Sequence, residues 1–127
     1  MGSPDMTVCG TGGASFSDVK TKVFKASCTI SNSCHDATGK MGGLDLATDP
    51  YKALLNVKPV WPVPVAEQLV EVAPNSLDKS FLWKKISLAT ATDPKYGGRM
   101  PNTGGQTVSA EQLQIVQCWI LGGAPNN

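Results

Sequence analysis

The 127-residue chain has little of what marks several large classes of protein. Charged residues make up only 17% of it and the formal net charge is +1, with no run of lysine and arginine, which argues against a nucleic-acid-binding protein. No apolar stretch approaches the length of a membrane span. The only histidine is His35, so a blue copper site, which normally uses two, is not expected.

The residues that are present indicate one folded domain. Apolar residues make up 41%, and the chain is long enough for a single hydrophobic core. Thirteen glycines and nine prolines favour short helices joined by long loops. The segment 1–3, Met-Gly-Ser, has the composition of a cloning remnant in place of a removed leader, so we expect an exported protein. We therefore divide the chain into an N-terminal extension with this remnant, 1–13, and a domain, 14–124.

Hydrophobic spacing and capping residues predict four helices, which span 15–28, 51–56, 77–87 and 110–121. The segment between the second and third helices is rich in proline and valine and predicts a covering loop that could include one short strand pair. Residues 90–98 are expected to form turns. Three lysines of the third helix are expected to face water: Lys79, Lys84 and Lys85.

Cys28, Cys34 and His35 form the most specific pattern in the chain. A cysteine directly before a histidine, with a second cysteine upstream, is the arrangement by which polypeptides attach haem. Two thiols add to the vinyl groups, and the imidazole binds the iron. The usual spacing is C-x-x-C-H, whereas here five residues separate the two cysteines.

A second axial ligand is expected from Met100. It lies in a glycine-rich loop just before Pro101, where a methionine is not needed for packing, and 65 residues after His35. Met41 is the rival, but it follows His35 by only six residues. A thioether opposite an imidazole raises the reduction potential and closes the sixth coordination position of the iron. This pair of ligands therefore predicts transfer of single electrons.

Other interpretations of these residues remain open. Cys28 and Cys34 could equally form a local disulfide. A zinc site is disfavoured, because adjacent Cys34 and His35 rarely reach one ion and a fourth ligand is missing. Nothing in the chain has the pattern of a nucleophile elbow or an oxyanion loop, which argues against a hydrolase.

Four cysteines allow three disulfide connectivities if all are oxidised. We interpret Cys9 and Cys118, which lie near opposite ends of the chain, as structural cysteines. Their pairing would close a loop that the chain-entropy model values at about 4–5 kcal/mol. Such a bond persists only in an oxidising compartment, which agrees with a periplasmic or extracellular location.

The order of these features resembles the cytochrome c family. In that family a phenylalanine lies one turn before the first cysteine, as Phe24 does here, and a Cys-His pair, middle helices, a Met-Pro loop and a C-terminal helix follow. More narrowly, the chain is similar to the small secreted cytochrome-c-like domains common in planctomycetes and myxobacteria. The shared strings lie at 42–46, 74–76, 81–85 and 109–124, and the resemblance covers roughly residues 14–124.

This resemblance implies an all-α, class I cytochrome c-like fold, with short helices and long loops around one haem c. Cys28 and Cys34 would form the thioether bonds, while His35 and Met100 would be the axial ligands of the iron. The first and last helices would cross and pack together. Further residues would line or stabilise the haem site: Phe24 as an apolar wall, Trp61 or Arg99 as a partner of a propionate, and Pro101 as a stiffener of the methionine loop.

Two departures from the family pattern concern the attachment site. The longer spacing requires the segment 29–33 to bulge outward, or attachment through Cys34 alone. The proline that in many relatives follows the histidine, and whose carbonyl holds the imidazole, is absent here, so His35 needs another acceptor.

The expected function is therefore that of an exported monohaem electron-transfer protein, not an enzyme, which exchanges electrons with redox partner proteins. Two alternatives stay open. One is a cytochrome-like fold without haem, held by disulfides, that serves as a binding or cell-envelope module. The other is a haem sensor or peroxidase in which the sixth coordination position is open.

Overall fold

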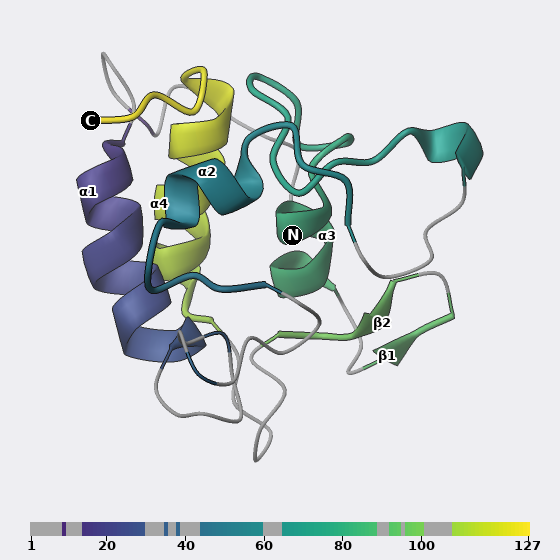
Figure 1. Ribbon diagram of the computed structural model, residues 1–127, viewed down its shortest axis with the longest axis horizontal. Helices are drawn as coiled ribbons and strands as arrows, with labels where there is room; N and C mark the ends of the chain where they lie inside the picture. The colour runs from purple at the N-terminus through teal and green to yellow at the C-terminus, as the bar shows by residue number, and fades with distance from the viewer. Residues whose placement is uncertain are drawn as a thin grey trace.

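A computed structural model describes most of the chain, and Figure 1 shows how its elements are arranged. The described part is mostly α-helical and includes one two-stranded antiparallel ribbon. Within it, no helix has both the length and the apolar character that crossing a membrane requires. The described residues are Cys9, 14–29, His35, Thr38, 44–59, 65–88, 92–94, 96–100 and 108–127.

The first helix has the extent that the sequence predicts. It begins as α1 (Phe16–Asp18), where the Ser15 hydroxyl accepts a hydrogen bond from the Asp18 amide at 3.1 Å. It continues without a break as η2 (Val19–Cys28), so that the two form one purple helix in Figure 1. The wider π-helical winding of η2 was not predicted. The apolar side chains expected on one face are all buried: Phe16, Val19, Val23 and Phe24.

The last helix, α4 (Ala110–Leu121), is confirmed together with its capping box. The Ser109 hydroxyl accepts from the Gln112 amide at 3.0 Å, and the Gln112 side chain accepts from the Ser109 amide at 2.8 Å. These two bonds satisfy amides that have no partner within the first turn of a helix. The helix ends at Gly122, as expected.

The first and last helices pack against each other, as the resemblance implied, and Figure 1 shows them side by side. The rings of Phe16 and Trp119 lie 5.0 Å apart, and Trp119 is fully buried. At the other end of the contact, the side-chain Nε2 of Gln112 donates to the Lys22 carbonyl at 2.9 Å and to the Ser27 hydroxyl at 3.0 Å. The core of the molecule is centred on this contact.

The middle of the chain covers one side of this pair. The helix α2 (Pro50–Leu54) begins at Asp49, whose carboxylate accepts from the Lys52 amide at 3.3 Å. It ends two residues before the predicted end. A short 3-10 helix, η4 (Val65–Glu67), follows. Leu55 then pairs with Val72 in an isolated parallel bridge, so extended pairing does occur here.

The third helix, α3 (Phe81–Ser87), begins four residues later than predicted. The hydroxyl of Ser80, which is fully buried, does not cap it. That hydroxyl donates to the Ser76 carbonyl at 2.7 Å and accepts from the Ala73 amide at 2.9 Å. The first amide of α3, that of Phe81, donates instead to the Val70 carbonyl at 2.7 Å. Residues 77–80 therefore form turns because their polar groups are used by the preceding extended segment.

The sequence gives no warning of the strands β1 (Thr92–Asp93) and β2 (Gly97–Gly98). They form a small antiparallel ribbon within the region expected to consist of turns, in register Thr92 to Gly98. Gly97 has a φ of +81°, a conformation that glycine adopts without the steric cost of a side chain. The ribbon leads directly into Arg99 and Met100.

A disulfide between Cys9 and Cys118 is present, which confirms the predicted pairing of these two cysteines. Their Cα atoms lie 5.4 Å apart, although 109 positions separate them in the sequence. The bond joins the N-terminal extension to the last turn of α4. It therefore ties the beginning of the chain to the helix pair that forms the core.

We expect Ser80→Ala to lower the free energy of unfolding by about 1–3 kcal/mol, because the half-buried Ala73 amide and Ser76 carbonyl lose the hydroxyl that they bond to. Urea unfolding followed by circular dichroism measures this change. Ser17→Ala, at an exposed position of α1, is the control and should change stability by less than about 0.5 kcal/mol. Equal stability of the two variants would contradict the role given to Ser80.

Reduction of the Cys9–Cys118 disulfide should lower the free energy of unfolding by about 4–5 kcal/mol, because it releases the large closed loop in the unfolded chain. The unfolded chain also becomes less compact, so the free energy of unfolding should fall more steeply with urea concentration. Parallel urea titrations with and without a thiol reductant measure both effects. An unchanged midpoint in the reduced protein would show that the bond does not constrain the unfolded state.

Candidate functional site

His35 is held by three hydrogen bonds. Its amide donates to the Cys28 carbonyl at 2.9 Å, and its carbonyl accepts from the Leu46 amide at 2.7 Å. Its ring Nδ1 lies 3.0 Å from the Leu44 carbonyl oxygen. A carbonyl oxygen can only accept, so Nδ1 carries the proton and the lone pair of the imidazole is on Nε2.

The Leu44 carbonyl is thus the acceptor that the sequence required but did not identify. A metal-bound histidine usually donates its other ring nitrogen proton in this way, which fixes the ring orientation and makes the bound nitrogen more basic. No feature of the Leu44 side chain signals this role, because the acceptor is a backbone atom. The half-buried His35 imidazole therefore uses Nδ1 for this bond and keeps the lone pair of Nε2 available.

Cys28 is the last residue of η2 and is half-buried. Its carbonyl is at the end of a helix, where backbone carbonyls have no partner within the helix, and the His35 amide supplies one. The helix end and the histidine are therefore joined directly through the backbone. Four residues of the predicted site lie outside the described part of the chain: Cys34, Met41, Trp61 and Pro101.

Met100 lies at the end of the ribbon segment and is half-buried against the hydrophobic core. Its amide donates to the Lys85 carbonyl at 2.8 Å, in the last turn of α3. The preceding residue, Arg99, donates from Nη1 to the Leu88 carbonyl at 3.2 Å. The backbone on both sides of Arg99 is therefore fixed against the end of α3.

The described residues of the predicted site are all close to one core. Cys28, Leu44 and Met100 each pack against the central cluster of buried side chains, and His35 is bonded to the first two. Phe24 belongs to that cluster and is fully buried, with its ring 6.3 Å from that of Phe16 in an edge-on arrangement. The predicted apolar environment of the site is present, and contact of Phe24 with a haem stays a prediction.

Lys85 is not exposed, contrary to the sequence-based expectation. It is half-buried, and its ammonium donates to the Tyr96 carbonyl at 3.0 Å. Burial lowers the pKa of Lys85, an effect that the nearby carboxylate of Glu71 opposes. Glu71 is only 8% exposed, and its burial raises the pKa of its carboxyl group to about 7, with Lys85 acting in the opposite direction.

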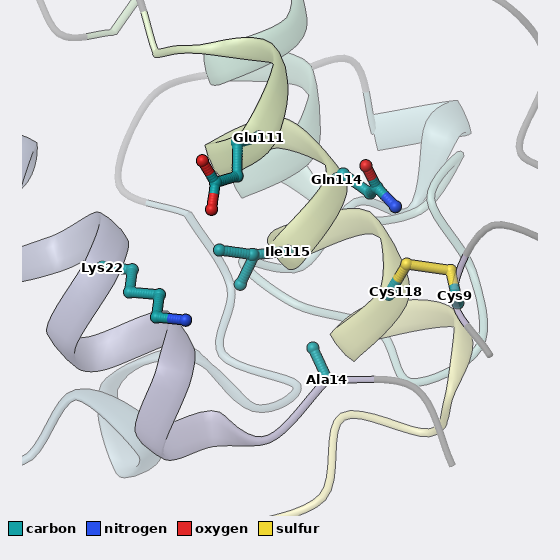
Figure 2. A pocket seen from close by; sticks show the side chains of 7 residues that line it. All are labelled: Cys9, Ala14, Lys22, Glu111, Gln114, Ile115 and Cys118. Carbon is teal, nitrogen blue, oxygen red and sulfur yellow. A yellow bond between two sulfur atoms is a disulfide. The ribbon is translucent and has the colours of Figure 1, made fainter. Parts of the chain in front are cut away.

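A shallow cavity of about 330 Å³ lies between η2 and α4, next to the disulfide. Figure 2 shows Lys22 and Glu111 on its two sides and Ile115 between them. A second hollow, of about 260 Å³, lies beside α2. Neither cavity is lined by His35 or Met100, so both are separate from the predicted site.

The donor atoms of the site suit a haem iron. In the described part of the chain, no three histidine, cysteine or acidic side chains gather to hold a metal ion. A haem iron takes its equatorial ligands from the porphyrin and needs only axial side chains from the protein, so no such cluster is required. An imidazole with its Nδ1 proton bonded to a carbonyl is well suited to this role.

The chain was compared with protein-family models, with curated proteins and with solved structures, and none matches. Its function is therefore inferred from the residues and contacts described above, together with the sequence pattern.

We expect the free energy of unfolding to fall by about 3 kcal/mol as the pH rises from about 4.5 to about 7, the window set by Glu71. In this window the folded protein holds a proton on Glu71 that the unfolded chain has lost, so raising the pH favours unfolding. Glu71→Gln should remove this slope and be the more stable protein at pH 8. Urea unfolding of both proteins at several pH values measures the free energy of unfolding as a function of pH.

The exposed Glu111 provides a control, because its substitution by Gln should leave the pH dependence intact. A slope that survives in Glu71→Gln would show that another group causes it.

Proposed function

We propose that the protein is an exported c-type cytochrome that transfers single electrons through one covalently attached haem. The observation that supports this most is the hydrogen bond from His35 Nδ1 to the Leu44 carbonyl. It leaves Nε2 available as a ligand in a protein whose only histidine directly follows a cysteine. A metal-bound histidine usually makes this second hydrogen bond.

Each residue of the site has a distinct role in this proposal. Cys34 and Cys28 would attach the haem, and a backbone hydrogen bond from His35 to Cys28 joins the histidine to the end of η2. His35 binds the iron through Nε2, and Leu44 holds the proton on Nδ1. Met100 supplies the second axial ligand from a segment fixed to α3.

When bound, the haem would supply a one-electron iron couple, and the protein would set its potential. A thioether ligand raises that potential, and an apolar surrounding around the site disfavours the extra charge of ferric iron. With both axial positions taken by side chains, no position is left for a substrate. The residues therefore favour electron transfer over peroxidase or sensor activity.

The compartment follows from the covalent chemistry. The Cys9–Cys118 disulfide persists in an oxidising environment, and haem attachment through cysteine takes place after export. We therefore propose a periplasmic or extracellular location. The partners would be redox proteins that exchange electrons with the haem.

The test is to produce the protein with an export leader in a host that attaches haem, and to record absorption spectra of the oxidised and reduced forms. We expect a sharp Soret band, α and β bands on reduction, and a weak band near the red edge in the oxidised state. Met100→Ala should abolish the red band and lower the potential by a substantial part of the roughly 0.8 V range that axial ligands span.

Met41→Ala is the matched control, since Met41 is the rival thioether and its loss should leave the red band unchanged. Mass spectrometry distinguishes one thioether bond from two. Exported protein with no Soret band would favour the haem-free, disulfide-held module. A high-spin spectrum that Met100→Ala does not change would favour the open sixth position.

A further inference from the structure

The segment 96–100, which ends in Met100, is held in place from outside rather than by its own sequence. Its centre is the pair Gly97-Gly98, and glycine has the widest conformational freedom of all residues. The ribbon with Thr92 and Asp93 is only two residues long on each side. A short ribbon of this kind is not stable by itself, so contacts with the rest of the protein must fix the position of Met100.

Lys85 contacts both ends of this segment. Its carbonyl accepts from the Met100 amide at 2.8 Å, and its ammonium donates to the Tyr96 carbonyl at 3.0 Å. The carbonyl belongs to the last turn of α3, and docking of the segment gives it the Met100 amide as a donor. Lys85 therefore joins the first and last residues of the segment to one rigid element.

The ammonium of Lys85 lies among groups that favour its positive charge. Its ammonium lies 5.8 Å from the centre of the Phe81 ring, and the buried carboxyl of Glu71 attracts it. The Glu71 carbonyl is in turn bonded to the Leu82 amide at 2.9 Å, which fixes Glu71 beside α3. Among the described residues, other charged groups near the segment include Glu67, which accepts from the Tyr96 hydroxyl at 2.6 Å, Lys84, whose ammonium lies 5.6 Å from the Tyr96 ring, and Arg99.

We propose that Lys85 is the positioning residue that fixes Met100 in place. That Met100 then binds iron rests on the function proposed above, but the holding of the segment does not. The contact with Tyr96 depends on the ammonium, whereas the contact with Met100 depends only on the backbone. Removing the ammonium therefore opens the segment without removing its docking site on α3.

The test compares Lys85→Met, which keeps the length and the backbone of the residue, with the wild-type full chain by amide hydrogen exchange followed by NMR. We expect exchange of the Met100 amide to accelerate roughly 10- to 100-fold, as loss of one charge-assisted hydrogen bond shifts a local opening equilibrium. The amides of Val116 and Ile120 in α4 report global unfolding and should change much less. Equal acceleration of all three amides would show that Lys85 only stabilises the fold, and would overturn the proposal.

Two further variants complete the design. Lys79→Met removes a chemically matched contact, because the Lys79 ammonium donates to the Glu67 carbonyl at 2.8 Å, and it should leave Met100 exchange within severalfold of wild type. Lys85→Arg keeps the charge and should restore most of the protection. If Lys85→Met does not fold, Lys85→Gln removes the ammonium instead and should accelerate Met100 exchange to a similar extent. Unchanged exchange in that variant would equally overturn the proposal.

The haem-loaded protein gives a second readout that separates the two proposals. If both hold, Lys85→Met weakens the red band and Lys79→Met does not. If Met100 exchange accelerates but Met100→Ala leaves the spectrum unchanged, the segment is positioned by Lys85 and the axial ligand is another group. If exchange is unaffected while Met100→Ala abolishes the red band, Met100 is the ligand and Lys85 does not position it.

Discussion

The contact between the first and last helices is the constraint on which the rest of this structure depends. Trp119 is fully buried against Phe16, and the Gln112 side chain of α4 donates to one carbonyl and one hydroxyl of η2 at the other end of the contact. Burial of large aromatic side chains is the main favourable term for a domain of this size. Because the helices are fixed relative to one another, the end of η2 has a defined place, and so has the histidine bonded to it.

Around this pair, the loops are positioned by backbone groups that the helix ends leave without partners. The Cys28 carbonyl at the end of η2 accepts the His35 amide, and the Lys85 carbonyl at the end of α3 accepts the Met100 amide. Both residues of the proposed iron ligation therefore depend on helix termini for their backbone position. The side-chain orientation of His35 then depends on one further carbonyl, that of Leu44.

The parts of the fold that the sequence predicted are those with local signals. The caps at Ser15, Asp49 and Ser109 act over three residues and are visible in the sequence, and each begins a helix where expected. The start of α3 was misplaced because the hydroxyl of Ser80 is engaged by Ala73 and Ser76, a competition that helical periodicity does not reveal. The candidate site residues were chosen in the same way, from the Cys-His pair and an isolated methionine in a loop.

By itself, the sequence determined the extent of the first and last helices and the chemical types available as ligands, and it favoured two cysteines as structural. Only the tertiary structure decided that these two pair, which carbonyl holds the imidazole of His35, and that Lys85 is half-buried with its ammonium bonded to Tyr96. The physical reason is that caps and hydrophobic faces depend on neighbours in the sequence. Acceptors for loop residues are backbone atoms from distant segments, and no side chain identifies them until the chain has folded.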